Sequence, residues 1–277
     1  MSDDEYTDIL YEVRDRITTI TINLDSKLNA LNGPQYLQLA KFIDQADKEE
    51  DTVVTILQAK GRYFSAGANV RDISVANADP SEIFSHEFWL KNFTGRNVYL
   101  TDLLHNHSKV LVCALNGPVI GLSAAIVALC DLVYVNDEST AYMLTPFSNL
   151  GLVAEGATSA TLFLRLGWSK SAEALLFAKP IPGSELNRLG FFNGTFTGKG
   201  LTTDQFNEEV HKLVLSKFEG LYEPSIFANK ALLRHNRDQL INSANARESI
   251  IGFNRWIEGI PQQRFVQIAN KEIKHKL

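Results

Sequence analysis

An apolar stretch between Val110 and Cys130 places the strongest limit on how this chain can fold. It covers 21 residues with only two strongly polar side chains, Asn116 and Ser123, so it is long enough to cross a bilayer. However, Asn116-Gly117-Pro118 breaks the stretch near its start, and no aromatic or basic belt marks both ends. We therefore expect a buried strand, a turn and a buried helix here, and no membrane span.

The composition is that of an ordinary globular protein with a sizeable core. Of the 277 residues, 45% are hydrophobic and 21% are charged, and the formal net charge is −5. An acidic chain lacks the basic face that a phosphate backbone requires, so we expect no nucleic-acid partner. The two cysteines, Cys113 and Cys130, lie in apolar stretches and fit no metal-ligand spacing, which predicts buried reduced thiols and no metal site.

The order of the expected elements is typical of an α/β core followed by helices. Strands are expected at 9–13, 17–23, 53–57, 110–115, 132–135 and 141–144, and helices at 36–47, 82–107, 122–129, 157–166 and 169–177. Past about Gly200 the strand-like runs end, and helical spacing is found at 203–218, 225–237 and 248–257. The sequence predicts a core domain over residues 1–200 and a helical C-terminal segment over residues 201–277, which packs on the core or on a neighbouring subunit.

Two loops of small residues are placed where backbone N–H groups could face a substrate. Gly121 precedes a helix of small residues, so the N–H of Leu122 would be an unpaired donor at the positive end of a helix. The loop Ala66-Gly67-Ala68 could supply a second N–H, from Ala68. Two such donors converging on one oxygen would form an oxyanion hole. Close packing of small residues without a ligand explains either loop alone equally well.

Glu155 is the only acidic residue between Glu138 and Glu173. Its neighbours at 152–154 are apolar, which should raise its pKa towards the working pH, as expected for a proton shuttle. The alternative is a carboxylate that favours the start of the helix following Thr158. Together with the two loops, this carboxylate indicates acid–base chemistry on an activated carbonyl compound.

Three segments give the chain a specific family resemblance. Phe64–Asn69, Leu115–Pro118 and Cys130-Asp131, at these separations, resemble the crotonase (enoyl-CoA hydratase/isomerase) superfamily, and Leu28–Leu31 resembles its early CoA-binding segment. The resemblance covers roughly residues 10 to 200. It implies a crotonase-like spiral of ββα units that holds CoA and the active site. Coenzyme A is then part of the substrate, and no separate cofactor is expected.

The resemblance also assigns roles to individual residues. The family holds the oxygen of a CoA thioester with two backbone N–H groups, which implies Ala68 and Leu122 here. Counting back from Cys130-Asp131, the first of the two hydratase glutamates falls at Ala125, and the second, which follows a proline, falls at Phe147 after Pro146. Hydration needs one group to activate water and another to deliver a proton, so apolar residues at both positions argue against a hydratase.

Glu155 lies instead where fungal Δ3-Δ2-enoyl-CoA isomerases of this family carry their catalytic glutamate. Moving a double bond from C3 to C2 removes a proton from C2 and returns one at C4. The dienolate between these steps carries negative charge on the thioester oxygen, which Ala68 and Leu122 would meet while Glu155 shuttles the proton. The implied role is in the β-oxidation of unsaturated fatty acids.

Four further residues are candidates for substrate binding. Lys27 could meet the CoA phosphates, with a solvated lysine as the alternative. Ala30 and Ala66 lie in the segments that the resemblance assigns to CoA and to the carbonyl loop. Asn97, in an otherwise apolar helical region, either orients Glu155 or a water, or is a structural amide. The acyl pocket is expected to be shaped by residues 77–92.

The same residues are open to three rival functions. A dienoyl-CoA isomerase would place an aspartate at Glu155 and use a second acid, which no obvious carboxylate supplies. A serine hydrolase is suggested by Gly121–Ala125, which nearly matches G-x-S-x-G, but the final glycine is absent and Asp204 with His211 is an arbitrary pair. A crotonase-like scaffold without activity would serve only oligomerisation or partner binding.

The C-terminal tripeptide His275-Lys276-Leu277 approximates the Ser-Lys-Leu address for peroxisomes. A basic tail that happens to end in leucine is the alternative. Because fatty-acid oxidation in fungal members of the family is peroxisomal, the resemblance favours import through a peroxisomal receptor. It also implies a homotrimer or a homohexamer.

Overall fold

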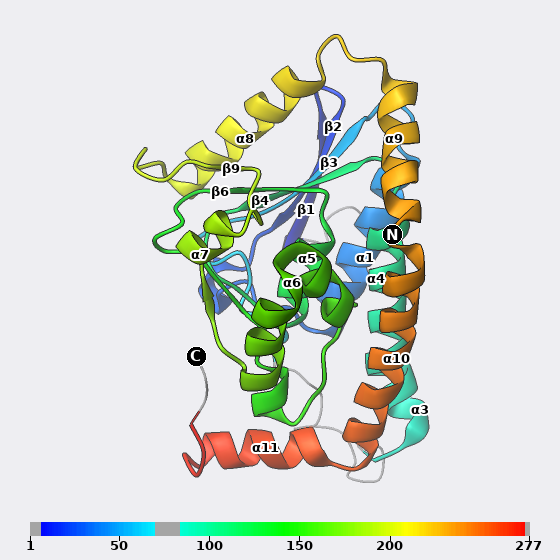
Figure 1. Cartoon of the computed structure of the whole chain (residues 1–277), viewed down its shortest axis with the longest axis vertical. Helices are drawn as coiled ribbons and strands as arrows, with labels where there is room; N and C mark the ends of the chain where they lie inside the picture. Colours follow the sequence, from blue (N-terminus) through cyan, green and yellow to red (C-terminus); the bar gives the residue numbers. More distant parts are fainter. Residues whose placement is uncertain (1–6, 70–83, 275–277) are drawn as a thin grey trace.

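The computed structural model describes residues 7–69 and 84–274, and within them six strands form one mixed sheet (Figure 1). The order across it is β1-β2-β3-β4-β6-β9. These strands are β1 (Ile9–Arg14), β2 (Ile17–Ile22), β3 (Val54–Ala59), β4 (Val110–Leu115), β6 (Leu132–Val135) and β9 (Gly194–Thr195). A smaller sheet of the order β5-β7-β8 contains β5 (Val119–Ile120), β7 (Tyr142–Leu144) and β8 (Ile181–Pro182).

The hairpin predicted at the start of the chain is confirmed. β1 and β2 are antiparallel and pair from Ile9 with Ile22 to Arg14 with Ile17. Asp15 and Arg16 form the two-residue turn with φ values of 53° and 64°, which suit the twist of a hairpin. From β2 to β9 each neighbouring pair in the larger sheet is parallel, so the intervening chain crosses over the faces of the sheet.

The apolar stretch folds as the sequence predicts, into a strand, a turn and a helix. β4 ends at Leu115, and the side-chain amide of Asn116 donates to the carbonyl oxygens of Gly61 and Tyr63 at 2.7 and 3.2 Å. Helix α5 (Leu122–Leu129) is buried along its whole length. Within residues 7–69 and 84–274, no helix is long and apolar enough to cross a membrane.

Helices cover both faces of the larger sheet. On one face α8 (Thr203–Phe218) packs through Phe206, Val210 and Val214. On the other face lie α1 (Gly33–Lys48) and α5, together with α4 (Gly95–Asn106). Asn32 caps α1 by accepting a hydrogen bond from the Gln35 N–H at 2.9 Å, and the Gln35 side chain accepts from the Asn32 N–H at 2.8 Å.

Several elements differ in detail from the sequence prediction, whereas the helices around Gly167 agree with it. The two helices predicted at 157–166 and 169–177 are both present: they share the label α6 (Thr158–Phe177) and meet at Gly167, whose φ of 76° and ψ of 169° are not helical. The segment expected to be one helix at 82–107 is described from residue 84, as α3 (His86–Trp89), the π-helix η4 (Leu90–Thr94) and α4. The short strands β5, β8 and β9 and the helix α7 (Gly183–Arg188) were not predicted, because such short elements carry no readable period.

The C-terminal part is helical, as predicted. It contains α8, α9 (Glu223–His235), α10 (Asp238–Ile257) and α11 (Ile260–Ala269), and the last of these was not expected. In Figure 1, α10 runs beside α4, and α11 turns away from its end to cross the base of the molecule. Cys113 and Cys130 are free and buried, as the sequence predicts. The division into domains at residue 200 stays a prediction.

Candidate active site

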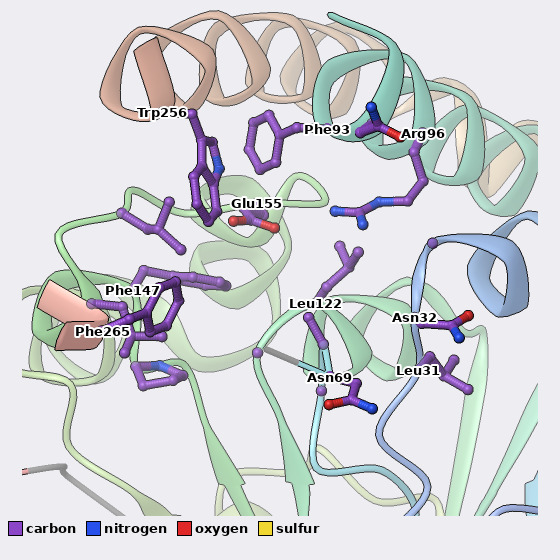
Figure 2. A pocket seen from close by; sticks show the side chains of 18 of the residues that line it. Leu31, Asn32, Asn69, Phe93, Arg96, Leu122, Phe147, Glu155, Trp256 and Phe265 are labelled. Carbon is purple, nitrogen blue, oxygen red and sulfur yellow. The ribbon is translucent and has the colours of Figure 1, made fainter. Parts of the chain in front are cut away.

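A pocket of about 530 Å³ lies between the loops of the core and the C-terminal helices (Figure 2). Segments distant in the sequence line it: the start of α1, the loop at 66–69, α3 with η4, the junction of β5 and α5, the segment 146–155, and the helices α10 and α11. Of the predicted site residues, Ala66, Ala68, Leu122 and Glu155 line this pocket together. The fold therefore brings both small-residue loops and the isolated carboxylate to one place.

The loop carrying Ala68 is held by the segment that the resemblance assigns to CoA. The N–H of Leu31 donates to the Gly67 carbonyl at 2.9 Å, and the N–H of Asn69 donates to the Leu31 carbonyl at 2.8 Å. This is a parallel bridge between Leu31 and Ala68. Because a strand directs successive N–H groups to opposite sides, the bonds made by Gly67 and Asn69 turn the Ala68 N–H away from Leu31.

Gly67 allows the two loops to approach closely. Its φ is +89°, and a Cβ at this position would lie 2.8 Å from the carbonyl oxygen of Ile120. A larger residue would therefore be strained in its backbone and would also push against β5. Glycine at this position brings the Ala68 loop next to the start of α5.

Leu122 is the first residue of α5, with Gly121 (φ 62°) as its N-cap. The N–H of Gly121 is used by the Leu144 carbonyl at 2.8 Å, whereas a first helical N–H has no acceptor within its own helix. In the part of the chain that the structure describes, neither the Ala68 N–H nor the Leu122 N–H donates to a protein acceptor. The pocket wall thus holds two backbone donors available to a ligand oxygen.

Glu155 is buried, with 7% of its surface exposed, and its carboxylate points into the pocket (Figure 2). The side-chain amide of Asn97 donates to Glu155 Oε2 at 3.0 Å, and Arg96 Nε donates to Asn97 Oδ1, also at 3.0 Å. Because a guanidinium only donates, Arg96 fixes the Asn97 amide with its NH₂ towards the carboxylate. The Arg96 guanidinium lies 5.2 Å from the centre of the Tyr36 ring.

The surroundings of Glu155 raise its pKa from 4.5 to about 7. Burial is the main cause, because it penalises the charged carboxylate. The positive charge of Arg96 and the Asn97 hydrogen bond act in the opposite direction, and the charge of Glu248 raises the pKa further. A carboxylate that titrates near pH 7 can both accept and return a proton under neutral conditions.

The helix-start role considered for Glu155 is filled by a different carboxylate. Glu248, on α10, accepts a hydrogen bond from the Ser159 N–H at 2.8 Å and another from the Ser159 hydroxyl, at the first turn of α6. Glu155 contributes its main-chain carbonyl there, which accepts from the Thr158 N–H at 3.2 Å. The side chain of Glu155 therefore does not cap the helix and lies in the pocket instead.

Three of the four predicted binding residues lie outside the pocket lining, and Asn97 among them is linked to the pocket through its hydrogen bond to Glu155. Lys27 is exposed at the end of the short helix η2 (Asp25–Lys27), and Ala30 is half-buried in the segment that follows. Their assignment to CoA stays a prediction.

Several lining residues were missed, among them Arg96, Trp256 and Phe265. Phe88, Trp89 and Asn92 belong to the segment 77–92 that was expected to shape the acyl pocket, of which residues 77–83 lie outside the described ranges. The position of Arg96 directly before Asn97 was the one local signal, because the aromatic residues come from helices that only tertiary packing brings together.

The positions of the absent hydratase glutamates are apolar in the structure as well. Ala125 is buried in α5, and Phe147 lines the pocket at the start of the 3-10 helix η5 (Phe147–Leu150). Among the lining residues in the described ranges, Glu155 is the one acidic side chain.

The serine-hydrolase alternative does not match the side-chain geometry. Ser123 is fully buried, and its hydroxyl lies 2.8 Å from the Ser65 hydroxyl and 3.4 Å from that of Tyr36. His211 is paired with Asp15 at 3.2 Å. No nucleophile–base pair is therefore formed by these residues.

Replacing Asn97 with leucine is expected to shift the pH dependence of catalysis upwards. The substitution removes a hydrogen bond that stabilises ionised Glu155, so the pKa of Glu155 should rise above about 7. If Glu155 acts as a base, the ascending limb of kcat/KM against pH moves to higher pH. Asn245→Leu is the matched control, because Asn245 is also a buried amide but donates to the Val98 carbonyl at 3.2 Å. An identical shift in both variants would contradict a specific role for Asn97.

The fold and the site define an enoyl-CoA hydratase/isomerase of the crotonase type. The sequence profile of the enoyl-CoA hydratase/isomerase family matches residues 12–250, and the chain belongs to this family. It is 40% identical to 3,2-trans-enoyl-CoA isomerase of Saccharomyces cerevisiae over 272 residues, which covers 97% of this chain and 96% of the relative. It is also 40% identical over 275 residues to a Delta(3,5)-Delta(2,4)-dienoyl-CoA isomerase of Pyricularia oryzae, covering 96% of this chain and 98% of that protein.

A solved structure shows the same fold. An enoyl-CoA hydratase/isomerase from Pseudoalteromonas atlantica superimposes with a TM-score of 0.81 at 22% identity, over 97% of this chain and 99% of that chain. The predicted crotonase-like α/β fold with a helical C-terminal segment is therefore confirmed.

Proposed function

We propose that the protein is a Δ3-Δ2-enoyl-CoA isomerase that converts 3-enoyl-CoA to trans-2-enoyl-CoA in the β-oxidation of unsaturated fatty acids. One observation carries the proposal: a single buried carboxylate, Glu155, shares an apolar pocket with two backbone donors, those of Ala68 and Leu122. The likeness to the isomerase of Saccharomyces cerevisiae supports the same reaction.

The reaction needs one acid–base group and one stabiliser of negative charge. The thioester oxygen accepts hydrogen bonds from the N–H groups of Ala68 and Leu122. Ionised Glu155 removes a proton from C2, the electrons of that C–H bond form the C1–C2 double bond of a dienolate, and the charge collects on the oxygen. Protonated Glu155 then delivers the same proton to C4, which leaves the double bond between C2 and C3 and restores the carboxylate.

A dienoyl-CoA isomerase is the second candidate because of the relative in Pyricularia oryzae. That reaction is expected to use an aspartate at the place of Glu155 and a second acid. The described lining residues offer a glutamate and no second carboxylate, which favours the simpler double-bond shift.

The assay that tests the proposal presents the purified protein with three substrates in parallel. We expect trans-3-hexenoyl-CoA to be converted to its 2-enoyl isomer, while a 2-enoyl-CoA is not hydrated and a 3,5-dienoyl-CoA reacts more slowly. Faster turnover of the dienoyl substrate would replace the proposal by its rival. Hydration without isomerisation would overturn it, and inertness towards all three would support the scaffold reading.

We also propose a homotrimer or homohexamer. The C-terminal helices carry exposed apolar side chains, including Leu232 at 66% and Leu233 at 72% on α9, and such patches are typical of subunit contacts. The mass in solution, measured by light scattering, tests this proposal, and a monomer at micromolar concentration would contradict it.

Peroxisomal import through His275-Lys276-Leu277 remains part of the proposal, although these residues lie outside the described ranges. A reporter fused to the last residues should enter peroxisomes, and deletion of Leu277 should abolish its import. Import that survives the deletion would exclude the tripeptide as the address.

A further inference from the structure

The pocket has two chemically different ends on either side of Glu155 (Figure 2). Asn32 and Asn69 lie at one end, beside the segment that holds the Ala68 loop. The opposite end is apolar, and the side chains of Trp89, Phe93, Phe147, Leu152, Trp256 and Phe265 are among those that form it. With the thioester oxygen at Ala68 and Leu122, the polar end suits the CoA portion and the apolar end suits the acyl chain.

The apolar end is closed by a packed aromatic group. The rings of Trp89 and Trp256 are stacked, with centroids 4.1 Å apart and planes 17° from parallel. Trp256 also contacts Phe93 and Phe265, each at a centroid distance of 6.1 Å. Trp89, Phe93 and Trp256 are buried. Because three helical elements hold these rings against one another, the wall resists displacement by a ligand.

Helix α11, which carries Phe265, is fixed to the core by polar and close contacts. Arg264 donates from Nε and Nη2 to the carbonyl oxygen of Asn149 at 3.1 and 3.0 Å. A Cβ on Gly151 would lie 2.7 Å from Ile260 Cγ2, so the turn after η5 touches the start of α11 directly. These contacts place Phe265 at a defined position next to Trp256.

We propose that Trp256 and Phe265 form the end wall of the acyl site and set the upper chain length of the 3-enoyl-CoA substrate. This inference rests on the proposed function. Each methylene buried before the wall should contribute about 0.8 kcal/mol, or roughly fourfold in kcat/KM. A chain that reaches the wall gains nothing from further methylenes and must displace packed rings.

One substitution next to the same wall should change the limiting chain length in the opposite direction. A Cβ on Gly252 of α10 would lie 2.7 and 2.8 Å from Cζ and Cε1 of Phe93, which stands between α10 and the pocket. Gly252→Ala should therefore press the Phe93 ring towards the acyl chain. Trp256→Ala and Phe265→Ala lengthen the site, whereas Gly252→Ala shortens it.

The experiment compares kcat/KM for straight-chain 3-enoyl-CoAs of increasing length, from hexenoyl-CoA upwards. We expect the wild-type value to rise and then fall at a limiting length. Trp256→Ala and Phe265→Ala should move that limit to longer chains, with at least about a tenfold gain on the first excluded chain. Gly252→Ala should move the limit to shorter chains. Phe227→Ala is the matched control. Like Phe265, Phe227 is partly buried, but it packs against the hydrophobic cluster that α8 forms on the other face of the larger sheet.

The outcomes separate the two proposals. If wild-type protein isomerises no chain length, the proposed function fails. If it is active but its limiting length is the same in the Trp256, Phe265 and Gly252 variants, the end wall is overturned while the function stands. If Phe227→Ala shifts the limiting chain length as much as Phe265→Ala does, the change comes from a general loosening of the fold, and the end-wall proposal is also overturned.

Discussion

Replacing Glu155 with glutamine is expected to lower kcat for 3-enoyl-CoA by about 10²–10⁴, the range that a general acid–base group contributes. Glutamine keeps the size of the side chain but can neither take the C2 proton nor return it at C4. Steady-state kinetics with trans-3-hexenoyl-CoA measures the loss. Glu248→Gln is the matched control, because Glu248 is also a buried glutamate but binds the start of α6. Retention of more than a tenth of the wild-type kcat in Glu155→Gln would contradict the proton-shuttle role.

Glu155→Gln should be more stable than wild type in alkaline solution. A variant that is inactive yet more stable has lost its proton transfer and kept its fold. The folded-state pKa of Glu155 is about 7, above its unfolded value of 4.5, so the folded state binds the proton more tightly. Protonated Glu155 stabilises the folded state fully below pH 4.5, and this stabilisation is lost as the pH rises through about 7. Glu155→Gln avoids this loss, so its advantage in Tm should grow between pH 5 and pH 8. A constant difference in Tm would contradict the raised pKa.

Replacing Leu122 with proline is expected to lower kcat by about 10²–10³, the cost of one oxyanion-hole donor. Proline lacks the N–H but suits the first position of a helix, where its ring causes no clash and the lost donor has no intrahelical acceptor. The fold of α5 should therefore survive.

Leu122→Ala controls for this substitution, since it removes the same side chain and keeps the N–H. The ratio of kcat between the alanine and proline variants then reports the donor alone, and circular dichroism reports the fold. Equal activity in the two variants would show that the Leu122 N–H does not contact the transition state.

The elements with a clear period were predictable from local sequence. The hairpin around Asp15 and Arg16, the buried strand and helix within 110–130 and the helix at 203–218 all lie where their patterns indicate. The two helices on either side of Gly167 were predicted as well, whereas α11 was missed altogether. The place of α11 in the fold depends on contacts with distant parts of the chain, which a local period does not contain.

The isolation of Glu155, the small residues of both loops and the absence of glutamate at 125 and 147 are evident from the order of the amino acids. These are properties of residue type and spacing, and they point to chemistry with a single carboxylate. The neighbours that act on Glu155 follow from the packing of the folded chain. In the folded chain the Asn97 amide nitrogen lies 3.0 Å from Glu155 Oε2, and Trp89 stacks on Trp256. Glu248, and not Glu155, accepts the hydrogen bond from the Ser159 N–H at the start of α6. Burial, pKa and pocket shape arise from segments far apart in the chain, and their positions are set by the packing of the whole fold.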